Sequence, residues 1–207
     1  MNFAQLVRFL DEYCQIYEFS GNLRITHRDK ILYHRCMGLA DRENDLSLTE
    51  TSLFQLYSLS KPFCAIGLLL LVDRGLVDLD AHPGKYVPEA AGFDSRVTIR
   101  QMLYHTSGLP DLEQYPKFAV EHPYRCATDY PQLISELAKY PQNFVPGTAT
   151  RYANINFMLP ARIVEEVTGL PYADYMAREV FAPLGMQTAC VDREGLLVKN
   201  RCRGYDV

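Results

Sequence analysis

One apolar segment constrains the fold more than any other part of the chain, because only a buried element can hold it. It covers Cys64–Val72 (CAIGLLLLV) and runs into Asp73-Arg74-Gly75, a charged end and a glycine that are typical of a helix C-terminus. Pro62 has no N–H group and fits only the first turn of a helix. We therefore predict a buried helix that begins near Ser58 to Ser60.

Ser58 and Lys61 stand three residues apart at the start of this helix, so their side chains share one face and can touch. A serine hydroxyl is a poor nucleophile until a neighbour accepts its proton. A neutral lysine can accept that proton, and a protonated lysine lowers the pKa of a neighbouring base. The pair therefore indicates nucleophilic catalysis. The alternative is that Ser58 or Ser60 only caps the helix, as serine often does.

Four short blocks occur in a fixed order along the chain. They are Phe54–Lys61 (FQLYSLSK), Met102–Pro110 (MLYHTSGLP), Pro146–Thr148 (PGT) and Tyr152–Asn154 (YAN). Together they resemble the serine β-lactamase and penicillin-binding-protein-like family, most closely the class C β-lactamases with their esterase and D-aminopeptidase relatives. The resemblance extends from about residue 20 to the C-terminus. It implies an α+β, β-lactamase/transpeptidase-like fold, in which an N-terminal helix and antiparallel strands accompany a mainly helical region that carries the nucleophile.

The resemblance also implies a role for each site residue. Ser58 would be the nucleophile, Lys61 its activator, Tyr152 the general base and Asn154 an anchor for the substrate and the lysine. The chemistry agrees, because a cation lowers a tyrosine pKa from about 10 and an amide offers both a donor and an acceptor. The alternative is that Tyr152 is one of fourteen tyrosines that mostly pack or face solvent. For His105 we expect a structural hydrogen-bonding role rather than a catalytic one.

A third motif of the family is missing from this chain. Relatives carry Lys-Thr-Gly or His-x-Gly after the tyrosine block, on a strand that forms one wall of the site and supplies an oxyanion donor. No such sequence follows Asn154, and His82-Pro83-Gly84 precedes the tyrosine block. We therefore expect a single β-lactamase-related domain over residues 1–207, incomplete at the C-terminus and lacking the C-terminal strands of its sheet. An open sheet edge of this kind favours self-association.

Periodicity and turn residues predict the remaining elements. The predictions are a helix over Met1–Tyr17, a hairpin of Gly21–His27 and Lys30–Gly38, a polar loop over 40–45, a turn-rich connector over 78–88, short helices over 97–105 and 131–140, a loop over 111–130, and helices over 155–167 and 172–180.

Composition excludes several classes of function. The net charge is −4 and no basic run carries interleaved aromatic residues, so we expect no nucleic-acid partner. The longest apolar run is too short to span a membrane. Five histidines show no paired ligand spacing, so a metal enzyme is the least favoured reading, and we expect no cofactor or metal.

The six cysteines and the N-terminal segment indicate the cellular compartment in which the chain folds. The segment lacks the pattern of a signal peptide, and the cysteines form no C-x-x-C pair. We therefore expect free thiols in a reducing, cytoplasmic setting, and a six-cysteine disulfide framework is the less favoured alternative.

Two functions remain. The first is a serine hydrolase that forms an acyl-enzyme on Ser58 with a β-lactam, a small ester, or an amide such as a D-amino-acid peptide. The second is a non-catalytic family member that acts as a binding or assembly module. The missing third motif favours the module, whereas retention of Ser58, Lys61, Tyr152 and Asn154 together favours the hydrolase.

Overall fold

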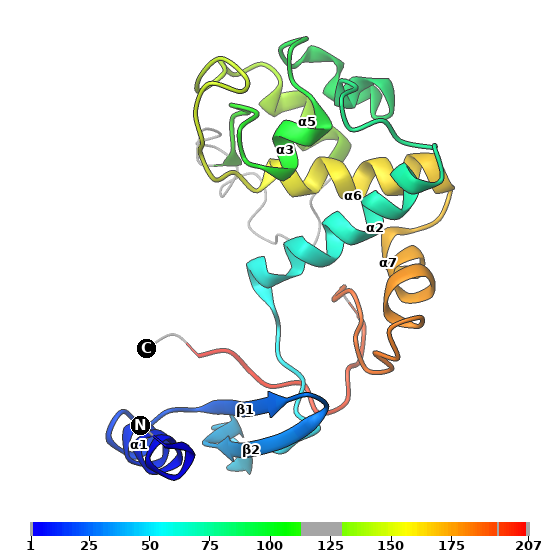
Figure 1. Ribbon diagram of the computed structural model, residues 1–207. Helices are drawn as coiled ribbons and strands as arrows, with labels where there is room; N and C mark the ends of the chain where they lie inside the picture. The colour runs from blue at the N-terminus through cyan, green and yellow to red at the C-terminus, as the bar shows by residue number, and fades with distance from the viewer. Residues whose placement is uncertain (1, 113–129, 194, 206–207) are drawn as a thin grey trace. The chain divides into compact units, whose positions relative to one another are not determined.

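The computed structural model describes residues 2–112, 130–193 and 195–205. The chain divides into two compact units, Met1–Gln55 with Leu196–Val207, and Leu56–Gly195. The named strands all lie in the first unit and most of the helices in the second (Figure 1). This distribution confirms the predicted α+β class.

The first unit is built from helix α1 (Phe3–Ile16) and the antiparallel hairpin of β1 (Gly21–His27) and β2 (Lys30–Met37). The N-terminal helix and the hairpin were both predicted. Tyr33 is the buried residue of β2, and its Oη donates to Asp11 Oδ1 of α1 over 2.6 Å. This hydrogen bond joins the helix to one face of the hairpin.

A second, much shorter strand pair corrects the loop predicted over 40–45. β3 (Leu39–Asp41) pairs with β4 (Leu46–Ser47), and the turn between them is held by Asp41, which accepts from the backbone N–H of Asn44 over 3.0 Å. Strands of two and three residues carry no alternation that periodicity can detect. In the same unit, the C-terminal segment returns to form a parallel bridge between Leu53 and Arg201.

Helix α2 (Lys61–Asp73) runs alongside α6 (Ile155–Thr168) in the second unit (Figure 1). A 3₁₀ turn over Tyr57–Ser60 leads into α2, so the helical segment begins where Pro62 predicted it would. The buried positions of α2 recur at helical spacing. They are Cys64, Gly67, Leu68 and Leu71.

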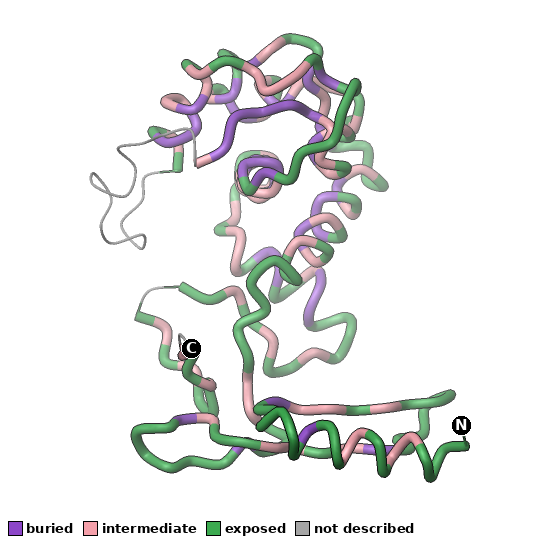
Figure 2. Tube along the Cα trace, turned by 90° about the vertical axis from the view of Figure 1, so that its left-hand side faces the viewer, coloured by how far each residue is buried: buried purple, intermediate pink, exposed green. Residues whose placement is uncertain are grey.

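In the described part of the second unit, several helices contribute residues to one buried apolar core. Figure 2 shows the buried positions along the chain. The predicted inward residues of α5 (Tyr130–Leu137) are confirmed, because Leu133, Ile134 and Leu137 are all buried. α3 (Ile99–Leu103) is shorter than the helix predicted over 97–105, because Thr98 caps its N-terminus in a capping box. The connector over 78–88 contains 3₁₀ turns, as its prolines and glycine suggested.

The predicted helix over 172–180 consists of α7 (Tyr172–Met176) and a π-helical turn over Ala177–Phe181. The loop predicted over 111–130 falls mostly on residues 113–129, which lie outside the described residues. In the parts of the chain that the structure describes, no helix combines the length and apolar character needed to cross a membrane.

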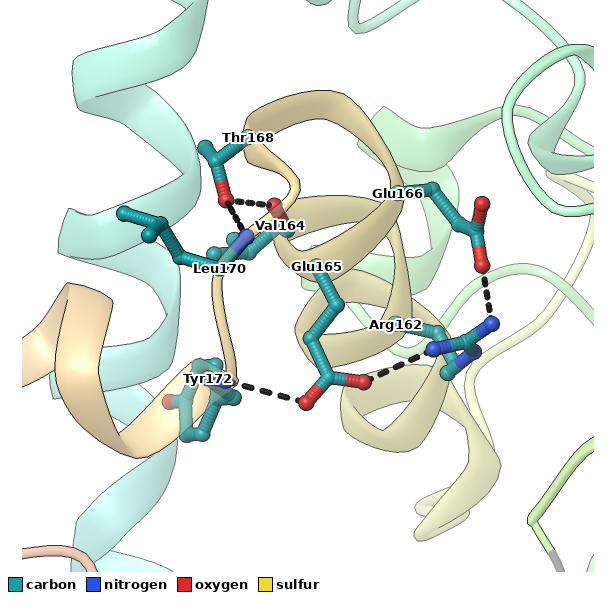
Figure 3. Close-up of polar contacts among 7 residues, drawn as sticks. All are labelled: Arg162, Val164, Glu165, Glu166, Thr168, Leu170 and Tyr172. Atoms are coloured by element: carbon teal, nitrogen blue, oxygen red, sulfur yellow. Dashed lines mark hydrogen bonds and ion pairs between the residues drawn. The ribbon is translucent and has the colours of Figure 1, made fainter.

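The turn from α6 to α7 is closed by glycine and by an ion-pair cluster (Figure 3). Gly169 ends α6 in the left-handed conformation at φ 66°, as predicted from Thr168-Gly169. Arg162 pairs with Glu165 over 2.9 Å and with Glu166, and the second oxygen of Glu165 accepts from the Tyr172 N–H over 2.9 Å. One carboxylate therefore links α6 to the first residue of α7.

Candidate active site

Ser58 lies on the exposed side of the 3₁₀ turn, one turn before α2. The residue before it, Tyr57, has a positive φ of 47°, a conformation that is uncommon outside glycine. The capping alternative receives no support, because the Ser60 side chain makes no capping hydrogen bond to α2. The Ser58 hydroxyl is instead directed to two side chains of the predicted site.

The predicted site residues meet at hydrogen-bond distance. Ser58 Oγ lies 2.5 Å from Tyr152 Oη, and Lys61 Nζ donates to Ser58 Oγ over 3.2 Å. Lys61 Nζ also donates to Asn154 Oδ1 over 3.1 Å and lies 4.7 Å above the centroid of the Tyr152 ring. One ammonium group therefore contacts the three other side chains.

Asn154 is held in place by a buried carboxylate that sequence reasoning did not single out. Asp111 Oδ2 accepts from the Asn154 backbone N–H over 2.7 Å and from its side-chain amide over 3.3 Å. Asp111 Oδ1 accepts from the Ile155 N–H over 3.3 Å. Because Ile155 is the first residue of α6, Asp111 satisfies free donors at the helix N-terminus and orients Asn154 toward Lys61.

His105 supports Tyr152 from the other side. Its ring stacks on the Tyr152 ring with 4.6 Å between centroids and 27° between planes. The Ala153 backbone N–H donates to His105 Nδ1 over 3.3 Å, and Asn156 Nδ2 lies 3.1 Å from the same nitrogen. These contacts agree with the structural hydrogen-bonding role expected for His105.

A buried polar pair connects the second sequence block, Met102–Pro110, to α6. Ser107 Oγ donates to Asn156 Oδ1 over 2.6 Å, and both residues are almost fully buried. Ser107 also accepts from the Leu109 N–H over 3.2 Å. The sequence signal for this pair was the second block, Met102–Pro110, in which Ser107 follows His105 by two residues.

The electrostatics of the cluster act mainly on Tyr152. The hydrogen bond from Lys61 lowers the pKa of Tyr152 from its ordinary value, and the hydrogen bond with Ser58 and the charge of Lys61 lower it further. Burial lowers the pKa of His105, and the nearby Lys61 charge adds to this effect. The lowered pKa favours the neutral form of His105.

The described residues contain no group of three or more histidine, cysteine or carboxylate side chains arranged to hold a metal ion. Five cysteines in the described part of the chain are free thiols, namely residues 14, 36, 64, 190 and 202.

Ser58, Lys61 and Tyr152 thus form one polar cluster at the start of α2. Comparison with known proteins gives the family to which this arrangement belongs. The family model described as Beta-lactamase matches residues 14–195. The chain belongs to the β-lactamase family.

Named relatives agree with this assignment. Penicillin-binding protein 4* of Bacillus subtilis (strain 168) is 35% identical over 175 residues, which cover 82% of this chain and 37% of the relative. Esterase EstB of Burkholderia gladioli is 36% identical over 175 residues, which cover 79% of this chain and 44% of the relative. The chain therefore spans less than half the length of these two curated relatives.

A solved structure shows the same fold. The crystal structure of a class C β-lactamase matches with a TM-score of 0.77 and 26% identity, covering 95% of this chain and 52% of the other. The fold class expected from the four sequence blocks is thereby confirmed.

Proposed function

We propose that this protein is a serine hydrolase that forms a covalent acyl-enzyme on Ser58. The observation that carries the proposal is the 2.5 Å separation between Ser58 Oγ and Tyr152 Oη, with Lys61 Nζ 3.2 Å from the same serine oxygen. A nucleophile within reach of a base, and a base oriented by a third group, is the signature of an activated hydroxyl.

The proposed reaction has two steps. Tyr152, as a tyrosinate, takes the Ser58 proton while Oγ attacks the substrate carbonyl carbon. The carbon–oxygen or carbon–nitrogen bond to the leaving group then breaks, and Tyr152 returns the proton to that group. In the second step Tyr152 takes a proton from water, the resulting hydroxide attacks the ester carbon, and Ser58 recovers its proton.

Lys61 and Asn154 would prepare the site for both steps. Lys61 lowers the pKa of Tyr152 and fixes the position of Ser58 Oγ. Asn154 uses its Oδ1 to hold Lys61, and its amide N–H₂ group would donate to a substrate carbonyl oxygen. This preorganisation costs nothing at the moment of reaction because the groups are already in place.

The substrate classes in the proposal are esters, amides and β-lactams. The names of the relatives support them, since one is an esterase and another a penicillin-binding protein. The second candidate is a binding or assembly module that keeps the family fold without turnover, and the adduct measurement described next separates the two candidates.

We predict that Ser58→Ala folds normally but forms no covalent adduct. Wild type, Ser58→Ala and the matched control Ser60→Ala would each be incubated with benzylpenicillin and with p-nitrophenyl acetate, and intact-protein mass measured. The proposal expects an adduct on wild type and Ser60→Ala and none on Ser58→Ala. An adduct of equal yield on Ser58→Ala would refute the nucleophile, and no adduct on any protein would favour the binding module.

A further inference from the structure

A second cluster of a nucleophile, a base and a carboxylate lies in the first unit and takes no part in the proposed hydrolase site. His34 and Cys36 stand two residues apart on β2, so their side chains point to the same face of the hairpin. Cys36 Sγ lies 3.8 Å from His34 Nε2, and His34 Nδ1 lies 3.2 Å from Glu50 Oε1. The three groups therefore form a continuous chain of polar contacts.

The contacts assign the hydrogen atom on the imidazole. An ionised carboxylate such as that of Glu50 only accepts hydrogen bonds, so the nitrogen that faces it, Nδ1, carries the hydrogen. In a neutral imidazole the other nitrogen then has the free lone pair. That nitrogen, Nε2, faces Cys36, so His34 presents an acceptor to the thiol hydrogen.

The segment that supplies Glu50 is fixed to the hairpin face by hydrogen bonds. Asn22 Nδ2, from the neighbouring strand β1, donates to Thr49 O over 3.0 Å. Ser52 closes the turn, because its N–H donates to Thr49 O over 3.1 Å and its Oγ accepts from the Thr49 N–H over 2.9 Å. The His34 side chain is 16% exposed, so the base is sheltered while Glu50 remains at the surface.

We propose that Cys36 is a site of thiol–disulfide exchange with small disulfides, with His34 as its general base and Glu50 as a positioning residue. The thiol proton passes to His34 Nε2 while Sγ attacks one sulfur of the disulfide. The Cys36–sulfur bond forms as the original sulfur–sulfur bond breaks, and the leaving thiolate takes the proton from His34. The products are a mixed disulfide on Cys36 and one small thiol, so the exchange needs no oxidant besides the disulfide.

The chain carries its own comparison thiols. Cys190 is more exposed than Cys36, and Cys202 is half-buried like Cys36 and belongs to the same unit. Burial raises the pKa of Cys202, which makes it less reactive. If exposure alone governed reactivity, Cys190 would react first. If His34 activates Cys36, the order reverses.

The test is the rate of mixed-disulfide formation at each cysteine of the full chain with bis(2-hydroxyethyl) disulfide at pH 7. This reagent is uncharged, so surface charge does not bias the result, and peptide mapping by mass spectrometry reads each thiol separately. We expect Cys36 to react at least about tenfold faster than Cys190, a low threshold because general-base assistance typically contributes about a hundredfold or more. In urea, where the cluster is dispersed, the two rates should become equal. A ratio near one in the native protein, or the same ratio in urea, would overturn the proposal.

Two variants test whether His34 activates the Cys36 thiol or only covers it. His34→Gln keeps most of the side-chain volume but removes the base, so Cys36 should slow by about tenfold or more, whereas Cys190 should not change. Glu50→Gln should slow Cys36 by a smaller factor. If His34 only covered the thiol, its replacement would leave the rate unchanged or raise it, and either result contradicts the proposal. Circular dichroism checks that each variant is folded. If His34→Gln unfolds, the proposal is decided by the Cys36 rate in Glu50→Gln and by the comparison of the Cys36 and Cys190 rates in urea.

Discussion

At the scale of single residues, Lys61 is the group on which the proposed site depends most. Its Nζ contacts Ser58 and Asn154 directly and lies over the Tyr152 ring. Lys61 therefore both contacts the proposed nucleophile and lowers the pKa of the proposed base. Its contribution can be separated from that of the other residues by the pH at which acylation begins.

We predict that Lys61→Gln moves the rising limb of the acylation rate to higher pH. Tyr152 must be ionised to accept the Ser58 proton, and Lys61 lowers the pKa of Tyr152. Without that cation the pKa returns toward about 10, so a higher pH is needed to form the same fraction of tyrosinate. The measurement is the rate of adduct formation against pH, with the exposed Lys85→Gln as control. If the rising limb of the rate–pH profile stays at the same pH in Lys61→Gln, the proposed role of Lys61 in lowering the Tyr152 pKa is contradicted.

Asp111 gives a second prediction for a single residue. Asp111→Asn places an amide N–H₂ group among three N–H donors that now share a carboxylate. We expect a loss of about 1–3 kcal/mol in the free energy of unfolding, because the amide offers one acceptor oxygen where the carboxylate offered two, so at least one buried N–H group loses its acceptor. Urea denaturation measures the loss, and Asp29→Asn in the exposed hairpin turn should be neutral. Adduct formation on Ser58 should also slow, since Asn154 would be oriented less firmly.

At the scale of elements, the segment from α3 to Asp111 is the one whose contacts were hardest to predict from the sequence. Its histidine and serine were recognised as a block, but their partners, Ala153 just before α6 and Asn156 within it, are separated from them by 48 to 51 residues. Gly108 allows this segment to turn, with φ at 72°. A Cβ atom at this position would collide with the backbone oxygen of Phe144.

We predict that Gly108→Ala lowers the free energy of unfolding by about 2–5 kcal/mol. The left-handed backbone costs a non-glycine residue about 1–2 kcal/mol, and the collision with Phe144 adds about 1–3 kcal/mol. Gly185→Ala is the matched control, because Gly185 also has a positive φ but open space around it. Thermal or urea unfolding of both variants should therefore differ by the collision alone. Equal losses would show that the turn can move away from Phe144.

Elements with strong local signals could be predicted from the sequence. Pro62 and the run behind it located α2, Gly169 located the end of α6, and the alternation of Leu23 and Ile25 located β1. The partners of Ser58 were identified through the order of the four blocks. Asp111 was not, because it acts on backbone N–H groups, and a backbone contact leaves no residue pattern to recognise.

At the scale of the whole molecule, the two units differ in how much they bury. The large apolar cluster lies within residues 68–181 of the second unit, whereas much of α1 and of the hairpin is exposed (Figure 2). Among the described residues, β1 and β2 pair only with each other, so each leaves one edge of backbone groups open. A two-stranded hairpin is marginally stable alone and offers its edges to other strands.

We predict that the chain self-associates through this hairpin. At low protein concentration, amides of Gly21–Met37 should exchange with deuterium faster than those of α2. At high concentration their exchange should slow, while α2 serves as the internal reference and sedimentation velocity reports the mass. A clean monomer at all concentrations, with one sharp unfolding transition, would contradict the prediction.

The spacing of Ser58 and Tyr152 also has a consequence for the time at which chemistry can begin. The two residues are 94 positions apart in the chain. A ribosome adds about 5–20 residues per second, so Ser58 is synthesised roughly 5 to 20 seconds before Tyr152, its proposed base. During that interval the growing chain carries an ordinary serine. In the proposed mechanism Ser58 becomes reactive only when the segment that carries Tyr152 and leads into α6 reaches the start of α2, so acylation would begin only once the helical core is complete.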